Sequence, residues 1–316
     1  MRNGIFCWVV KILSAIISFG IIFLSIQPFF IPKFFGDSST IVKGYSLQKR
    51  NSIDVLFLGA SQMFCTIDAG TLSDKYGISS YDFGASSQHL SITPFYFDTA
   101  LRTQTPKLVM VEVCTIFSKN SDLNNPTLAQ SFNPMDASID KFMTINRVLN
   151  GDIFTAFKYT VTPLFLYHDR WKSMNEDDIG FVINPQKYID NESRGFFLRD
   201  HVEEHSIAFF NGDKTLKSIP VESQEALLYI AEQCKEKNIK LVLFKAPVSN
   251  WTKGESLSVQ QFSDKNNLEY IDLNENLKEI GINEKTDFYN FEHLNASGAK
   301  KTTEYLAKIL PTYIED

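Results

Sequence analysis

A serine and a histidine that are far apart in the chain each lie where a side chain can do chemistry. Ser61 comes two residues after Gly59, at the end of the apolar run IDVLFLG. A serine on a tight turn between a strand and a helix exposes its hydroxyl, and the backbone N–H groups of the turn can stabilise negative charge on a carbonyl that it attacks. Gly-x-Ser after a strand is also a common turn, so Ser61 alone does not establish a nucleophile.

His293 lies near the C-terminus, in the segment DFYNFEHLNASGAKK. A helix is expected directly after it, with Asn295 or Ser297 as the N-cap. A loop histidine at the carboxyl edge of a sheet can reach a serine at the same edge and act as its general base. A lone histidine more often caps a helix or lies on the surface, so the pair matters more than either residue.

The elements around these two residues predict an α/β fold, a three-layer α/β/α sandwich with a parallel, flavodoxin-like sheet. Short apolar runs predict buried strands over residues 53–59, 78–83, 108–113, 239–245 and 268–272. Helical patterns lie between and after them, over residues 62–75, 88–103, 222–237, 255–265 and 296–310. Ligands in such sheets bind outside the carboxyl ends of the strands, where Ser61 and His293 are expected.

The N-terminal region, residues 1–34, predicts a membrane anchor. Residues 12–32 are largely apolar, and about 20 such residues cross a bilayer as a helix. A signal peptide would have a shorter apolar region and a small-x-small cleavage site, and a core helix would have a polar face. Basic residues flank the span on both sides, so the positive-inside rule does not set its orientation.

The remaining residues, 35–316, are expected to form one α/β domain with an inserted cap. Residues 33–52 have the polar composition of a linker. Over residues 115–215 the alternation of strands and helices stops, and Asn, Asp, Phe and Pro are frequent. We therefore expect this segment to be the cap.

Composition excludes several classes of function. The formal net charge is −6 and no basic cluster stands out, which argues against nucleic acid as a partner. The four cysteines form no C-x-x-C pair, so neither a zinc ribbon nor a disulfide framework is indicated. There is no Walker motif and no G-x-G-x-x-G, so we expect no nucleotide cofactor.

Together, the serine and histidine segments resemble the SGNH (GDSL-like) hydrolase superfamily. In that superfamily the nucleophilic serine follows the first strand, a glycine after the second strand supplies an oxyanion donor, and a D-x-x-H motif precedes the last helix. Ser61, Gly84 in YDFGASSQ and His293 match these positions. The resemblance implies that Ser61 is the nucleophile and His293 the base, and that the backbone N–H groups of Ser61 and Gly84 bind the oxyanion.

The closer resemblance is to membrane-anchored relatives in Gram-positive bacteria. These include the D-alanyl-lipoteichoic-acid transfer proteins and other surface-polysaccharide acylation proteins. The segments KAPVSNW (245–251) and YHDRW (167–171) are similar to an anchored subgroup of these hydrolases. This resemblance implies a catalytic domain outside the cell membrane and a cell-envelope glycopolymer or acyl carrier as substrate. It also makes a multi-spanning membrane acyltransferase a candidate partner.

Two departures from the family pattern bear on activity. The third strand ends in VEVCTIF rather than in a G-x-N-D motif, and the loss of one oxyanion donor costs about 10²–10³ in rate. Asn290 stands at the usual aspartate of D-x-x-H, and an amide there can hold the wrong imidazole tautomer, at a cost of about 10⁴. Asp287, six residues before His293, is the expected orienting acid, while a weak site or another acid remain alternatives.

Other residues are candidates for the substrate cleft: Gln62, Asn290, Lys245, His168 and Arg170. Lys245 ends a strand at the active edge and either binds an anionic group or pairs with an acid. His168 and Arg170 either line the cleft or have a packing or helix-end role.

The segment HVEEH, from His201 to His205, fits an inverted zinc-peptidase motif. It lies in the irregular insertion, so a solvated charged segment is favoured and no metal is expected. The leading hypothesis is thus a membrane-anchored serine esterase or O-acyltransferase acting on acyl esters of a cell-envelope glycopolymer. The alternative is a non-catalytic scaffold or binding subunit of a polysaccharide acylation complex, which the presence of Asn290 supports.

Overall fold

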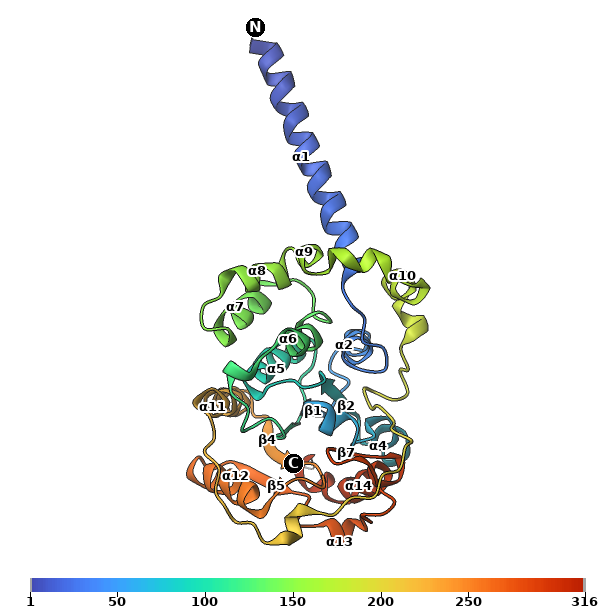
Figure 1. Ribbon diagram of the computed structural model, residues 1–316, viewed down its shortest axis with the longest axis vertical. Helices are drawn as coiled ribbons and strands as arrows, with labels where there is room; N and C mark the ends of the chain where they lie inside the picture. Colours follow the sequence, from blue (N-terminus) through green and yellow to red (C-terminus); the bar gives the residue numbers. More distant parts are fainter. Residues whose placement is uncertain (1, 315–316) are drawn as a thin grey trace.

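The computed structural model describes residues 2–314, a long N-terminal helix attached to an α/β domain (Figure 1). Helix α1 (Arg2–Phe30) extends away from the domain, and its side chains from Phe6 onward are largely exposed. Its segment Phe6–Phe30 has 25 residues and a mean hydropathy of 2.4. The helix therefore has the length and composition to cross a membrane, although a signal sequence near the N-terminus has the same properties.

The centre of the domain is a parallel sheet of five strands in the order β2-β1-β3-β4-β5. The strands are β1 (Val55–Gly59), β2 (Ser80–Gly84), β3 (Leu108–Glu112), β4 (Lys240–Lys245) and β5 (Glu269–Asp272). Every residue of the first three strands is buried, as expected for strands covered by helices on both faces. The predicted α/β fold with a parallel sheet is confirmed.

Helices connect and flank the strands: α3 (Ser61–Phe64), α4 (Ala69–Tyr76), η1 (Leu90–Ile92), α5 (Thr93–Leu101), α11 (Val221–Glu236), α12 (Lys253–Lys265), α13 (Leu277–Ile280), α14 (Ala296–Ile309) and α15 (Pro311–Ile314). The single helix predicted over residues 62–75 is wrong, because the chain turns at Cys65 and starts again as α4. Asp68 caps this second helix by accepting a hydrogen bond from the backbone N–H of Thr71. A short hairpin of β6 (Phe288–Asn290) and β7 (His293–Leu294) precedes α14.

The expected polar linker contains a helix, α2 (Ser38–Ser46), that packs into the core. Its apolar residues Ile41, Val42 and Tyr45 lie on one face and are buried. The ring of Tyr45 stacks on Phe83 of β2, with ring centroids 4.1 Å apart. Three apolar positions among many polar ones are a weak signal in the sequence, and only the contact with β2 makes this helix part of the domain.

No strand lies between β3 and α11 in the part of the chain that the structure describes. Short helices occupy this segment: η2 (Asn120–Asp122), α6 (Asn125–Phe132), α7 (Ile139–Val148), α8 (Ile153–Thr160), α9 (Pro163–Tyr167), η3 (His168–Lys172), α10 (Glu176–Ile183), η4 (Pro185–Tyr188) and η5 (Ala208–Asn211). We call residues 115–215 the cap, as in the sequence analysis. Helices α8, α9 and α10 lie beside the C-terminal end of α1, where α1 meets the domain in Figure 1. We call this end the foot of α1.

Candidate active site

Ser61 stands at the carboxyl edge of the sheet, as the first residue of α3 and two residues after β1 ends. Gly59 at the end of β1 pairs with Gly84 at the end of β2. A Cβ on Gly84 would lie 2.0 Å from the carbonyl oxygen of Gly59, so only glycine allows the two strand ends to approach this closely. Gly84 thus lies at the strand end beside β1, near Ser61, as expected.

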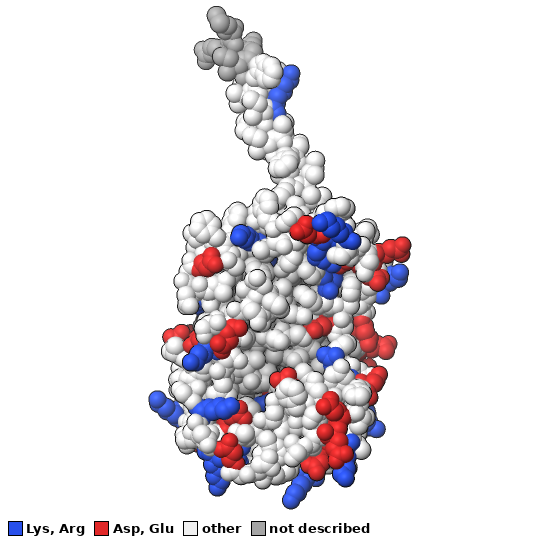
Figure 2. All heavy atoms as spheres, viewed as in Figure 1, with Lys and Arg blue, Asp and Glu red and all other residues white. Residues whose placement is uncertain are grey.

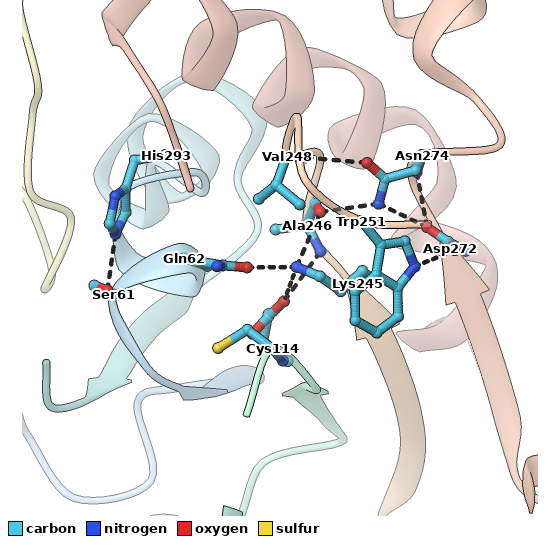
Figure 3. A network of polar contacts seen from close by, with 11 residues as sticks. Ser61, Gln62, Cys114, Lys245, Ala246, Val248, Trp251, Asp272, Asn274 and His293 are labelled. Atoms are coloured by element: carbon cyan, nitrogen blue, oxygen red, sulfur yellow. Dashed lines mark hydrogen bonds and ion pairs between the residues drawn. The ribbon is translucent and has the colours of Figure 1, made fainter. Parts of the chain in front are cut away.

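His293 reaches Ser61 from the β6–β7 hairpin, and the distance from its Nε2 to the Ser61 Oγ is 2.8 Å (Figure 3). The hairpin is held against the start of α14, where Asn295 is the N-cap and accepts from the backbone N–H groups of Ser297 and Gly298. The prediction that the two side chains lie within hydrogen-bond distance is confirmed. Such a contact is the geometry that a serine nucleophile and its base require.

The other ring nitrogen of His293 contacts Asn290. The distance between His293 Nδ1 and Asn290 Oδ1 is 3.0 Å, and the backbone N–H of Glu292 also donates to this Oδ1, at 2.9 Å. A backbone N–H can only donate, so the atom facing the imidazole is the amide oxygen and Nδ1 must carry the proton. The lone pair of Nε2 then faces the hydroxyl of Ser61. The amide of Asn290 therefore selects the tautomer that a general base needs, contrary to the concern raised by the sequence.

The expectation that Asp287 orients His293 is wrong in its geometry. The carboxylate of Asp287 is buried and accepts hydrogen bonds from Lys301 Nζ at 2.6 Å, Ser297 Oγ at 2.8 Å and the backbone N–H of Asn283 at 2.7 Å. Burial opposes its ionisation, but these hydrogen bonds outweigh it and hold the pKa of Asp287 below its usual value. Asp287 therefore ties the hairpin to α14 and does not contact the imidazole.

The surroundings of His293 favour its neutral form. Burial is the main cause that lowers the pKa of His293, and the positive charges of Arg199 and Lys245 lower it further, to about 4. The negative charges of Glu112 and Asp37 act in the opposite direction and are outweighed. The imidazole is consequently unprotonated at neutral pH, which is the state in which it can accept the serine proton.

A buried ion pair lies next to Gln62, the residue after Ser61. Lys245 at the end of β4 and Glu112 at the end of β3 are 2.8 Å apart, and their side chains are 1% and 0% exposed. The carboxylate also accepts from the backbone N–H groups of Cys114 and Ala246. Nζ of Lys245 donates in addition to Oε1 of Gln62 (Figure 3). Of the two roles considered for Lys245, the structure therefore supports pairing with an acid.

Two cleft candidates lie away from this site. His168 is exposed on η3, with its side chain 66% accessible. Arg170 pairs with Asp178 at 2.8 Å and donates to the carbonyl of Phe30 at the end of α1. Of the two roles considered for these residues, the structure supports the packing or helix-end role, because their contacts place them at the foot of α1.

The zinc-peptidase interpretation also finds no support. Residues 201–205 are not helical, so His201 and His205 are not presented together as the motif requires. His205 lies 3.4 Å from Glu203, and His201 packs its ring against Tyr289. Within residues 2–314, no group of three His, Cys, Asp or Glu side chains is placed to hold a metal ion.

The sequence analysis missed two residues of the site, Glu112 and Arg199. Glu112 is a charged residue at the end of the apolar run LVMVEV, and an acid at the end of a buried strand is a signal that could have been used. Arg199 lies between the rings of Phe197 and Tyr289, at 4.4 and 5.1 Å from their centroids. Nothing in the surrounding sequence marks Arg199, because it comes from the irregular part of the cap.

Comparisons with known proteins add little to this geometry. No protein-family model and no curated protein matches the chain. A solved structure that resembles it is that of a Bacteroides fragilis protein provisionally described as an acylhydrolase. The two are 10% identical with a TM-score of 0.40, over 90% of this chain and 100% of the other. A match at this level carries no argument about chemistry, so the proposals below depend on the site itself.

The contacts of Asn290 and Asp287 predict opposite effects of substitution. Asn290→Ala removes the group that selects the tautomer and should lower kcat for a soluble ester by about 10²–10⁴. Asp287→Asn should leave kcat within a few fold and instead destabilise the fold by about 1–3 kcal/mol, since a buried carboxylate loses charged hydrogen bonds. Steady-state kinetics and thermal unfolding of both variants test this. A large loss of kcat in a well-folded Asp287→Asn would restore Asp287 as the orienting acid.

The pKa of His293 predicts the pH dependence. The base form is lost only as the pH falls through about 4, so kcat/KM should stay high through mildly acidic pH. Asn290→Asp places a carboxylate at Nδ1, which favours the imidazolium and raises the pKa of His293. The acid limb of the kcat/KM profile should therefore move to higher pH in Asn290→Asp. If the limb does not move, the group that titrates there is not His293.

Proposed function

We propose that this chain is a membrane-anchored serine esterase or O-acyltransferase that acts on acyl esters of a cell-envelope glycopolymer. The observation that supports the chemistry is the 2.8 Å contact between His293 Nε2 and Ser61 Oγ, with the tautomer set by Asn290. The substrate class follows the resemblance of the motifs to anchored polysaccharide acylation proteins. The apolar helix α1 would hold the domain at the outer surface of the cell membrane.

In the proposed reaction Ser61 Oγ attacks the ester carbonyl carbon while its proton passes to His293 Nε2. The tetrahedral intermediate then collapses, the bond to the alkoxy oxygen breaks, and the leaving alcohol takes the proton from His293. Water, or a hydroxyl of an acceptor polymer, attacks the acyl-serine in the second half with the same proton transfers reversed. Hydrolysis and acyl transfer differ only in the acceptor.

The oxyanion needs N–H donors at the carboxyl edge of the sheet. The backbone N–H of Ser61 is at the first position of α3 and has no acceptor within that helix. The backbone N–H of Gly84 is the second donor in the proposal, because its strand ends beside that of Gly59. The family's third donor, an Asn after the third strand, has no counterpart here.

Gln62 is the residue that we propose in place of the missing donor. Its Oε1 accepts from Lys245, whose position is fixed by Glu112. The amide orientation is therefore set, and Nε2 keeps both N–H groups, for which we find no acceptor among residues 2–314. In Figure 3 the amide lies between Lys245 and the pair of Ser61 and His293. Gln62 directly follows the nucleophile, so its amide can bind a substrate oxygen that develops charge.

One observation favours the alternative, a non-catalytic scaffold subunit. Asn290 gives Nδ1 of His293 a neutral partner, so no adjacent carboxylate stabilises the imidazolium that forms during attack. In a serine triad, replacing that acid by an amide costs about 10⁴ in rate. Asn290 keeps the required tautomer, so the loss in rate here comes only from the missing negative charge and is expected to be smaller.

Labelling with a fluorophosphonate probe tests the proposal directly. An activated serine forms a bond from its oxygen to phosphorus with loss of fluoride, so the wild-type chain should be labelled at Ser61. Ser61→Ala should abolish the labelling, whereas Ser86→Ala, a serine beside the second strand, should keep it. Peptide mass spectrometry locates the adduct, and a folded wild type that is never labelled would leave the scaffold role as the better account.

Gln62 should behave as a transition-state donor. Gln62→Ala and Gln62→Glu both remove the proposed N–H and should lower kcat by about 10²–10³ with little change in KM. Lys245→Met should lower kcat as well, because the amide is then free to turn, and it should reduce stability since Glu112 is left unpaired. A folded Gln62→Ala with unchanged kcat would remove Gln62 from the mechanism.

A further inference from the structure

The lower end of α1 is fixed to the cap by polar contacts. Gln27 is buried in an otherwise exposed, apolar helix; it donates to the carbonyl of Val161 at 3.0 Å and accepts from the backbone N–H of Leu164 at 3.3 Å. Arg170 Nη1 donates to the carbonyl of Phe30 at 3.0 Å. These contacts give the cap a defined position relative to α1, so that the cap would lie at the surface of any membrane that α1 crosses.

Large apolar side chains point to solvent from the cap helices at the foot of α1. Phe154, Phe165 and Trp171 are 76%, 64% and 64% exposed, and Ile183 is 72% exposed. On the face shown in Figure 2 the surface on one side of the foot of α1 is mostly uncharged, whereas a group of acidic and basic side chains lies on the other side. Exposed aromatic residues at the end of a span are typical of the bilayer interface. They indicate that the cap faces lipid head groups.

A cavity of about 600 Å³ opens at this same level. Its walls come from the end of α1, the chain after it, α2, and the cap helices. Its lining includes apolar residues such as Leu24, Pro28 and Phe181. It also includes the basic residues Lys33, Lys43 and Lys141. A lining that contains both apolar and basic side chains fits an amphiphile with an anionic head.

No acidic side chain among residues 2–314 lies close enough to pair with the lysines of this cavity, although the charges of Asp178 and Asp136 act on Lys33 and Lys141 from farther away. Lys141 is 2% exposed, and its Nζ donates to one backbone carbonyl, that of Met135, at 2.9 Å. Within the described residues none of the three lysines forms an ion pair, although the exposed Asp136 also lines the cavity. Burial lowers the pKa of Lys33 to about 8 and that of Lys141 to about 7. A buried ammonium group without a counter-charge is unfavourable, and a bound anion would stabilise it.

We propose that this cavity binds the anionic head group of a phospholipid from the leaflet that faces the domain, with the acyl chains lying along α1. The proposal rests on the membrane anchoring given under the proposed function. The phosphate would accept from Lys43 and Lys141, which act as compact charges with free donors. A lipid in this site would tie the cap to the bilayer in addition to the span.

Native mass spectrometry of the full chain in detergent micelles tests the site. Phosphatidylglycerol and phosphatidylcholine with identical acyl chains are offered as probes. The wild type should prefer the anionic lipid by about 25-fold, since Lys43 and Lys141 each contribute about a factor of five near an anionic phosphate. The double variant Lys43→Gln, Lys141→Met should lose this preference. Lys158→Gln changes an exposed lysine of α8 outside the cavity and should keep it.

Three results would overturn the lipid site. They are equal retention of both lipids by the wild type, an equal loss of preference in Lys158→Gln, and sn-glycerol 3-phosphate binding as tightly as the lipid. The second would indicate diffuse surface charge, and the third a site for small anions. If thermal unfolding shows that the double variant is not folded, the single variant Lys43→Gln tests the site. Its preference for the anionic lipid should then be smaller than that of the wild type.

Carbonate extraction of membranes separates this proposal from the anchoring on which it rests. A full chain that is released by carbonate is not anchored by α1, and the proposed anchoring then fails together with the lipid site. A chain that stays with the membranes but shows no lipid preference refutes the lipid site alone. Labelling of Ser61 is independent of both results, so a failure of the catalytic proposal is recognised separately.

Discussion

The buried ion pair between Glu112 and Lys245 organises the carboxyl edge of the sheet. Two charges that are almost completely excluded from water must be paired, and removing one partner of such a pair costs about 3–5 kcal/mol. The carboxylate also satisfies the backbone N–H groups of Cys114 and Ala246, where the chain leaves β3 and β4. The ammonium group donates to Gln62, the residue after Ser61. A single pair of charges thus links two adjacent strands, the loops that follow them and the residue after Ser61.

The rest of the site depends on close approach and on neutral hydrogen bonds. Gly59 and Gly84 let the ends of β1 and β2 come together without side chains between them. Asn290 then sets the imidazole tautomer through an amide oxygen whose identity is fixed by a backbone donor. With no carboxylate at Nδ1 and with burial as the largest effect, the pKa of His293 falls to about 4. The site thus combines an imidazole that is unprotonated at neutral pH with weak stabilisation of the imidazolium.

The two ends of the domain have different environments. The cap helices beside α1 present aromatic side chains and a basic cavity, and they hold the helix through Gln27 and Arg170. The β6–β7 hairpin and α14, which carry the histidine, lie in the part of the domain away from α1 in Figure 1. His168 and Arg170, for which the sequence left open a cleft or a packing role, lie at the first end. In our proposals one end of the domain contacts lipid and the other reaches polymer.

The sequence by itself determined the parallel sheet, the apolar N-terminal helix and the meeting of Ser61 with His293. Those features depend on local patterns and on one rule, that the carboxyl ends of parallel strands share an edge. Only the tertiary structure decided which neighbour contacts the imidazole. The hairpin register pairs Asn290 with His293, while Asp287 points to Ser297 and Lys301 of α14. Asn290 and Asp287 lie three and six residues before His293, and such separations in a loop do not fix which side chain points to the imidazole. The pairing of two strands does fix it. The tertiary structure also decided that Lys245 pairs with Glu112, because the two residues become neighbours only across β3 and β4.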